Sequence, residues 1–139
     1  MKIAIINGPN LNLIGKRQPE VYGNESMDEW IDSLKKKYAN QEISYFQSNV
    51  EGEIINEIQD QGSVVDAIVL NPGAYSHTSV AIGDAVLSVN CKVIEVHISN
   101  IFAREDFRKH SFVSGVCDGF ICGFGLKGYQ IAIETLLPH

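Results

Sequence analysis

Glu95 and His97 stand two residues apart at the end of the apolar run KVIEVH, residues 92–97. In an extended strand, side chains that are two residues apart lie on the same face of the sheet. A carboxylate in this position accepts a hydrogen bond from one imidazole nitrogen and leaves the other nitrogen directed beyond the strand. The pair therefore has the composition of an oriented general acid, although a purely structural pair at a strand end has the same composition.

A second candidate is the stretch GKRQPEVYG, residues 15–23, which carries a guanidinium and a phenol between two glycines. A tyrosine with a pKa near 10 acts as a base only when nearby positive charge favours the phenolate. Lowering that pKa by about 3 units requires roughly 4 kcal/mol, which one or two close arginines supply in a site that contains little water. Arg17 and Tyr22 share this loop, and Arg108 follows the fourth apolar run. We expect a loop that closes over a site; a solvent-exposed connection is the alternative.

Five short runs rich in Ile and Val predict the strands that must position these residues. The runs are residues 2–6, 43–47, 67–71, 92–97 and 119–123, and their composition is typical of parallel strands that helices cover on both faces. Helical patterns fall over about 27–38, 51–61, 78–89 and 126–137. This alternation predicts right-handed crossovers and a parallel sheet, hence an α/β three-layer sandwich of flavodoxin-like type in a single domain, residues 1–139.

Two local signals mark helix ends. Ser26 followed by Glu29 forms a capping box, which predicts the start of the first helix. Gly62 is placed to end the second helix.

The ligand crevice of such a sheet lies beyond the carboxyl ends of its strands. The segments NGPNLN, QSNVEG, NPGAYSHTS and HISN follow the first four predicted strands. They are rich in Asn, Ser, His and Gly, which hydrogen-bond small polar ligands. We therefore expect four loops to converge on one site for a hydroxylated organic acid.

Several functional classes are disfavoured by composition and motifs. The formal net charge is −6, which argues against nucleic acid or an anionic membrane as partner, although a local basic pocket is compatible with it. The loop NGPNLNLIG matches neither phosphate-binding glycine motif and places a proline where a free N–H is needed. His77 and His97 have no carboxylate at a recognised metal-ligand interval. We expect no cofactor and no metal.

The chain is expected to be cytoplasmic and to have no membrane span. No apolar run approaches the roughly 20 residues that cross a bilayer, and MKIAII is too short for a signal-peptide core. Three cysteines, Cys91, Cys117 and Cys122, form an odd set without metal-ligand spacing, so we expect reduced, buried thiols.

Five ordered blocks carry a resemblance that covers nearly the whole chain: NGPNLNLIGKRQPEVYG, FQSNVEGE, LNPGAYSHTSVAIGDA, EVHISNIFAREDFR and GFGLKGY. On these blocks the sequence resembles type II 3-dehydroquinate dehydratases. Two departures are Gly83, where relatives more often carry a charged or larger residue, and the stretch SGVCDGFICG; neither is at a catalytic position. The resemblance implies a flavodoxin-like hydro-lyase of the shikimate pathway, which eliminates water from 3-dehydroquinate by the anti route through an enolate.

The resemblance also implies a role for each matching residue. Tyr22 removes the C2 proton, Arg17 lowers its pKa, Asn10 positions a water on the enolate oxygen, His97 protonates the departing hydroxyl, and Glu95 orients His97. Asn71 and the backbone of Ile98 and Ser99 bind the substrate carboxylate, and His77, Asp84 and Arg108 hold the ring hydroxyls. In the family the counterpart of Asp84 comes from an adjacent subunit of a dodecamer built from trimers.

Two alternatives stay open. One is a flavodoxin-like protein that binds a flavin or nucleotide and does no chemistry. The other is a non-catalytic relative that keeps the shell of the site for oligomer packing, although Tyr22 and His97 are both present.

Overall fold

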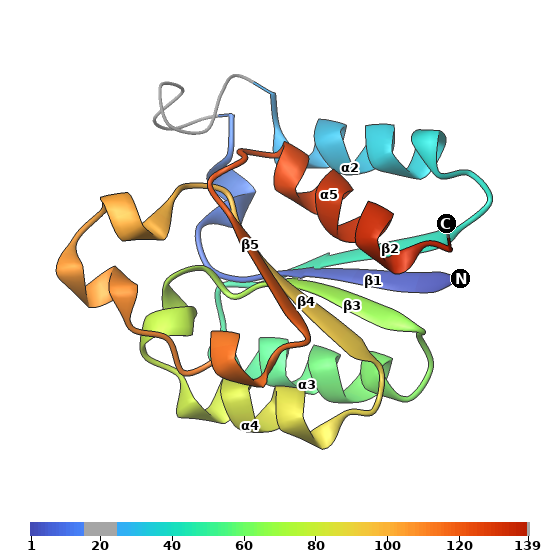
Figure 1. The fold of residues 1–139 in the computed structure, drawn as a ribbon. Helices are drawn as coiled ribbons and strands as arrows, with labels where there is room; N and C mark the ends of the chain where they lie inside the picture. The colour runs from blue at the N-terminus through green and yellow to red at the C-terminus, as the bar shows by residue number, and fades with distance from the viewer. Residues whose placement is uncertain (16–24, 139) are drawn as a thin grey trace.

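A five-stranded parallel sheet forms the centre of the molecule in the computed structural model, which describes residues 1–15 and 25–138 (Figure 1). The strands are β1 (Lys2–Asn7), β2 (Glu42–Gln47), β3 (Ala67–Asn71), β4 (Lys92–His97) and β5 (Gly119–Cys122). Every adjacent pair is parallel, in the order β2-β1-β3-β4-β5. This is the strand order of flavodoxin-like folds, so the predicted fold class is confirmed.

In the part of the chain that the structure describes, four α-helices cover the sheet, two on each face. They are α2 (Met27–Lys37), α3 (Glu51–Gly62), α4 (Val80–Ser88) and α5 (Lys127–Leu136). Figure 1 shows α2 and α5 on one face and α3 and α4 on the other. Short 3₁₀ turns lie in the connections, among them η1 (Leu11–Leu13), η2 (Gly73–His77), η3 (Ile101–Ala103), η4 (Asp106–Lys109) and η5 (Ser114–Val116).

The strands build two separate cores because alternate side chains point to opposite faces. Ile3 and Ile5 of β1 pack with α2 and α5, whereas Ala4 and Ile6 pack with α3 and α4. Both faces of the sheet are therefore apolar, which explains the continuous hydrophobic runs in the sequence. On β4, Val93 belongs to the core beneath α3 and α4, and Glu95 and His97 share its side of the strand.

The helix boundaries follow the predicted signals with small differences. Ser26 accepts a hydrogen bond from Glu29 N, as the predicted cap requires. The third helix begins at Val80 rather than near residue 78, because the hydroxyl of Ser79 caps the N–H of Ile82. Gly62 is the last residue of α3 rather than the first residue beyond it.

The three cysteines are free thiols, as predicted, but each is only partly buried. Burial raises the pKa of Cys117 to about 12, and the negative charges of Glu95 and Asp118 act in the same direction. Within residues 1–15 and 25–138, no helix combines the length and the apolar character that a membrane span requires.

Candidate active site

A pocket of about 270 Å³ lies at the carboxyl ends of β1, β3 and β4. The described residues that line it follow these strands: Pro9 to Leu11, Leu13 and Ile14 after β1, Asn71, Gly73, Ala74 and His77 at β3, and His97 to Ser99, Ile101, Arg104 and Arg108 at β4. A crevice in this position is the general ligand site of open parallel sheets. The pocket therefore lies at the carboxyl edge of the sheet, where the sequence predicted the ligand site.

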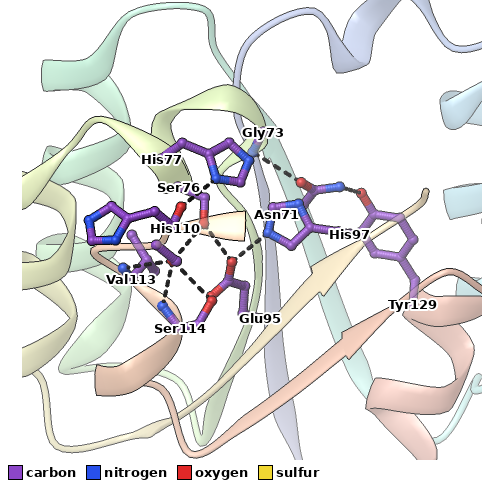
Figure 2. A network of polar contacts seen from close by, with 11 residues as sticks. Asn71, Gly73, Ser76, His77, Glu95, His97, His110, Val113, Ser114 and Tyr129 are labelled. Atoms are coloured by element: carbon purple, nitrogen blue, oxygen red, sulfur yellow. Dashed lines mark hydrogen bonds and ion pairs between the residues drawn. The ribbon is translucent and has the colours of Figure 1, made fainter. Parts of the chain in front are cut away.

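His97 reaches this pocket while Glu95 lies behind it. His97 is 5% exposed and Glu95 is 0% exposed. His97 Nε2 lies 2.5 Å from Glu95 Oε2 (Figure 2). A carboxylate oxygen only accepts, so Nε2 carries the proton, and Nδ1 is the nitrogen that remains for a ligand. The geometry is that of an imidazole oriented by a carboxylate, as the spacing of two predicts.

The carboxylate of Glu95 has a second hydrogen bond. Ser76 Oγ on η2 donates to Glu95 Oε2 at 2.8 Å, and Ser111 Oγ lies 3.0 Å from Ser76 Oγ. We call Ser76, Glu95, His97 and Ser111 the acid network. None of its members except His97 lines the pocket.

Asn71, at the end of β3, is held by a different group of residues. Its Nδ2 donates to Tyr129 Oη at 2.8 Å, and its Oδ1 accepts from Gly73 N at 3.0 Å. Tyr129 Oη donates in turn to Asn7 Oδ1 at 2.8 Å, and Asn7 Nδ2 donates to Tyr45 Oη at 3.3 Å. We call Asn7, Tyr45, Asn71 and Tyr129 the amide network. It fixes the Asn71 amide so that its second N–H is left for the pocket.

Asn10 directly precedes η1 and has a φ of 68°, in the left-handed region that asparagine tolerates better than most residues. Its backbone N–H donates to Asn49 Oδ1 at 3.0 Å. Gln47 Nε2 donates to Gly8 O at 3.1 Å and to Asn49 Oδ1 at 3.2 Å. The loop after β2 was expected to line the site. It is absent from the described lining of the pocket, and it supports the loop after β1 instead.

His77 lies opposite His97, with 6.1 Å between the ring centroids and 28° between the planes. Its Nδ1 lies 2.7 Å from His110 O. A carbonyl oxygen cannot donate, so Nδ1 carries the proton and the neutral ring offers Nε2 as an acceptor. Burial lowers the pKa of His77 from 6.5, and the neighbouring His97 and Arg108 contribute in the same direction. The ring is therefore a neutral acceptor at neutral pH.

Two arginines give the pocket positive charge in a chain of net charge −6. Arg108 Nε lies 2.5 Å from Glu105 Oε2, and this contact holds the pKa of Glu105 below its usual value. Arg104 Nη1 donates to Ser99 Oγ at 3.3 Å. The sequence interpretation singled out Arg108 but missed Arg104. The same signal applied to both, because both follow the end of β4 and the carboxyl edge of the sheet is the binding edge.

The structure brings together most of the predicted site residues that it describes. Asn10, Asn71, His77, His97, Ile98, Ser99 and Arg108 line the pocket, and Glu95 lies directly behind His97. Asp84 does not join them: it is exposed on α4 and absent from the lining.

Arg17 and Tyr22 lie outside the described residues. The ends of that segment are described. A side-chain carbon on Gly15 would lie 3.0 Å from the backbone of Glu25, so residues 15 and 25 lie side by side, next to the pocket-lining Ile14.

The flavodoxin-like sheet, the histidine oriented by a carboxylate and the two pocket arginines have the composition and geometry of an enzyme site suited to acid–base chemistry on a small anionic ligand. Comparison with known proteins assigns the family. The model of the class II dehydroquinases matches residues 1–137. The chain belongs to the class II dehydroquinase family.

Individual relatives agree in sequence and in structure. The 3-dehydroquinate dehydratase of Psychromonas ingrahamii is 48% identical over 139 residues, which cover 99% of this chain and 93% of the relative. That of Idiomarina loihiensis is 50% identical over 140 residues, 98% of this chain and 91% of the relative. The crystal structure of the type II dehydroquinase from Butyrivibrio crossotus superposes with a TM-score of 0.94 at 50% identity and covers 98% of this chain and 97% of that one.

Proposed function

We propose that this chain is a 3-dehydroquinate dehydratase, a hydro-lyase that removes water from 3-dehydroquinate by anti elimination and forms 3-dehydroshikimate. Family membership over residues 1–137 and the pair Glu95–His97 at the pocket carry the proposal. The reaction belongs to the shikimate pathway of aromatic amino acid biosynthesis or to quinate catabolism. The alternative of a non-catalytic flavin or nucleotide binder is not favoured, because the relatives are named as dehydratases.

The first step is removal of a proton from C2, next to the C3 ketone. Tyr22 is the proposed base: its phenolate takes the proton, and the electron pair of the C–H bond moves through C2–C3 to the ketone oxygen, which gives an enolate. Arg17 and the pocket arginines Arg104 and Arg108 favour the phenolate electrostatically. Asn10, which lines the pocket, positions a water that donates to the enolate oxygen.

The second step expels the C1 hydroxyl. The enolate re-forms the C3 carbonyl, the C1–C2 double bond forms, and the C1–O bond breaks with its electrons on oxygen. His97 donates a proton from Nδ1 to that oxygen, so water leaves. The negative charge of Glu95 at 2.5 Å stabilises the protonated ring and holds its orientation.

The remaining pocket residues bind the substrate in this proposal. The Asn71 amide and the backbone of Ile98 and Ser99 receive the carboxylate, and His77 and Arg108 hold the ring hydroxyls. A neutral His77 that offers Nε2 as an acceptor suits a hydroxyl donor. Arg108 only donates hydrogen bonds, so it would contact a hydroxyl oxygen, whereas His77 would accept a hydrogen bond from a hydroxyl proton.

Asp84 belongs to the proposal through a second copy of the chain. It is exposed on α4 with Val80 and Leu87, four residues before it and three after it, which are 55% and 65% exposed. Residues at this spacing share one face of a helix. An exposed apolar face that carries one carboxylate suits a contact with another subunit, whose pocket would receive Asp84. The proposed assembly is a dodecamer of trimers, in the cytoplasm, where the free cysteines remain reduced.

A direct assay tests the activity. The purified protein is mixed with 3-dehydroquinate without added cofactor or metal, and the ultraviolet absorption of the conjugated product is followed. Appearance of the enone supports the proposal, and its absence with intact, folded protein contradicts it. Borohydride added with the substrate leaves activity unchanged if the route has no imine intermediate, and it inactivates an enzyme that forms one.

Tyr22→Phe tests the base. The substitution removes the proton acceptor and little contact area, so turnover is expected to fall below detection while ligand affinity changes little. Steady-state rates and calorimetric binding of a substrate analogue measure the two effects. Turnover near that of the parent protein would mean that another group removes the C2 proton.

A further inference from the structure

The carboxylate of Glu95 makes both of its hydrogen bonds through one oxygen. Oε2 receives His97 Nε2 and Ser76 Oγ, whereas Oε1 is buried and has no partner among the described residues. Glu95 has three rotatable side-chain bonds, so the contact with His97 alone does not fix the plane of the carboxylate. The Ser76 hydroxyl is the second point that orients it (Figure 2).

Ser111 determines the direction of the hydrogen bond between the two serines, because its oxygen already accepts from other groups. Ser111 Oγ accepts from the backbone N–H of Val113 at 3.0 Å and of Ser114 at 2.9 Å. These two amides fill the two lone pairs of the hydroxyl, and Ser114 Oγ lies 3.0 Å from it. The proton of Ser111 is left for Ser76 Oγ at 3.0 Å, and the proton of Ser76 is left for Glu95.

The chain of hydrogen bonds is therefore polarised toward the carboxylate. It begins at the backbone amides of Val113 and Ser114, at the start of η5, which cannot reverse their direction, and it ends at Glu95 Oε2. Hydrogen bonds in such a chain strengthen one another. The chain thereby fixes the plane of the Glu95 carboxylate, which sets the direction in which the ring of His97 presents Nδ1.

The backbone holds Ser111 beside Ser76. Phe112 N donates to Ser76 O at 2.9 Å. On the other side, a side-chain carbon on Gly83 of α4 would lie 2.5 Å from Phe112 O. The glycine at this position lets the segment around Ser111 approach α4 closely. The two serines are 35 residues apart in the chain and are joined by this packing.

We propose that Ser76 and Ser111 are positioning residues for the general acid: they hold the Glu95 carboxylate so that His97 presents Nδ1 to the pocket. The proposal rests on the proposed dehydratase function. Neither serine lines the pocket, so neither touches substrate. They act on the water-expelling step through Glu95 and His97, and proton removal at C2 does not depend on them.

The test compares Ser76→Ala and Ser111→Ala with Ser79→Ala. Ser79 is also a buried serine, 2% exposed, but its hydroxyl caps α4 and does not join the acid network. The measured quantities are kcat, KM and the loss of deuterium from C2-deuterated substrate recovered from the reaction, corrected for exchange without enzyme. The last quantity reports proton removal separately from water expulsion.

We expect Ser76→Ala to lower kcat by about tenfold to 100-fold, the range for loss of one hydrogen bond to an ionisable group. Ser111→Ala lowers it by a smaller factor, because Ser76 still reaches Glu95. KM changes little in both, and deuterium loss relative to product formation rises. Ser79→Ala leaves kcat and this ratio at the parent values.

Two results overturn the proposal: a kcat for both network variants equal to that of Ser79→Ala, or a parallel fall of exchange and product formation. Ser111 is only partly buried, so Ser111→Ala decides the question if Ser76→Ala does not fold. A parent protein that forms no product contradicts the dehydratase assignment itself, which separates that failure from failure of the serine proposal.

Discussion

On the face of the sheet that α2 and α5 cover, the strands end in the amide network; on the face that α3 and α4 cover, they end in the acid network. Asn7 and Asn71 share the side of Ile5 and Val69, and Glu95 shares the side of Val93. The amide network consists of uncharged groups, and none of its described buried atoms lacks a partner. The acid network contains the ionisable pair Glu95 and His97, and Glu95 Oε1 has no partner among the described residues.

This difference suggests different roles: the amide network positions Asn71, and the acid network takes part in proton transfer. A neutral network that satisfies itself is rigid and keeps one orientation of Asn71 whether or not a ligand is bound. A buried carboxylate with an unpaired oxygen is costly, and such a cost is common where charge is needed for catalysis. We therefore expect changes in the acid network to affect kcat and changes in the amide network to affect stability and ligand affinity.

Glu95→Gln is expected to give the largest effect. The substitution keeps the size of the side chain but removes the charge that stabilises the imidazolium, so kcat should fall by about 10²–10⁴-fold, the usual contribution of an acid–base group. Steady-state kinetics measure it. Glu53→Gln on α3 is the matched control: Glu53 also accepts from a serine, Ser48, but lies outside the acid network. Equal kcat values for Glu95→Gln and Glu53→Gln would show that the acid network has no special role in catalysis.

Tyr129→Phe tests the amide network. Tyr129 is fully buried, and burial raises the pKa of its phenol, so the hydroxyl serves as a neutral donor and acceptor. Its loss leaves Asn71 Nδ2 and Asn7 Oδ1 without partners, which should lower the free energy of unfolding by about 2–4 kcal/mol. KM should rise more than kcat falls. Denaturant unfolding and steady-state kinetics measure these effects.

The control for that variant is Tyr75→Phe, whose hydroxyl donates to Asn49 O at an exposed position. Water replaces that bond, so the loss should stay below about 1 kcal/mol. If Tyr129→Phe were as stable as Tyr75→Phe, the buried amide network would contribute no more to the free energy of unfolding than an exposed hydrogen bond.

A smaller effect is expected from pH through His77. Burial lowers its pKa from 6.5 in the folded state, so the unfolded chain takes up a proton first as pH falls. Linkage then makes the folded protein less stable below pH 6.5, relative to neutral pH, until the folded ring is protonated as well. His77→Gln should show a shallower loss of stability between neutral and mildly acidic pH. An equal or steeper loss in the variant would mean that the ring titrates normally.

The sequence was sufficient for the parts of the site that depend on local periodicity. Strand β4 and the shared face of Glu95 and His97 follow from alternation along a strand, and the position of the pocket follows from the order of parallel strands. Arg108 was found by the same rule, and Arg104 was missed although the rule covered it. The predicted helix ends differ by one or two residues because side-chain caps such as Ser79 set them.

The supporting residues could not be predicted in this way. Ser76 and Ser111 are 35 residues apart, and Asn71 and Tyr129 are 58 residues apart. Such contacts depend on how α5 and the segment after η4 pack against the sheet, and no local pattern encodes that packing. A tyrosine on an amphipathic helix gives the same signal whether its hydroxyl is in solvent or in a buried network.

The central claim is that the acid network supplies the proton for the second step and takes no part in the first. The most direct measurement follows His97→Asn with C2-deuterated 3-dehydroquinate, and records deuterium loss from recovered substrate together with product formation. For His97→Asn we expect product formation to fall by about 10²–10⁴-fold while the substrate still loses deuterium from C2. Product formation near the parent rate, or exchange and product reduced by the same factor, would contradict it.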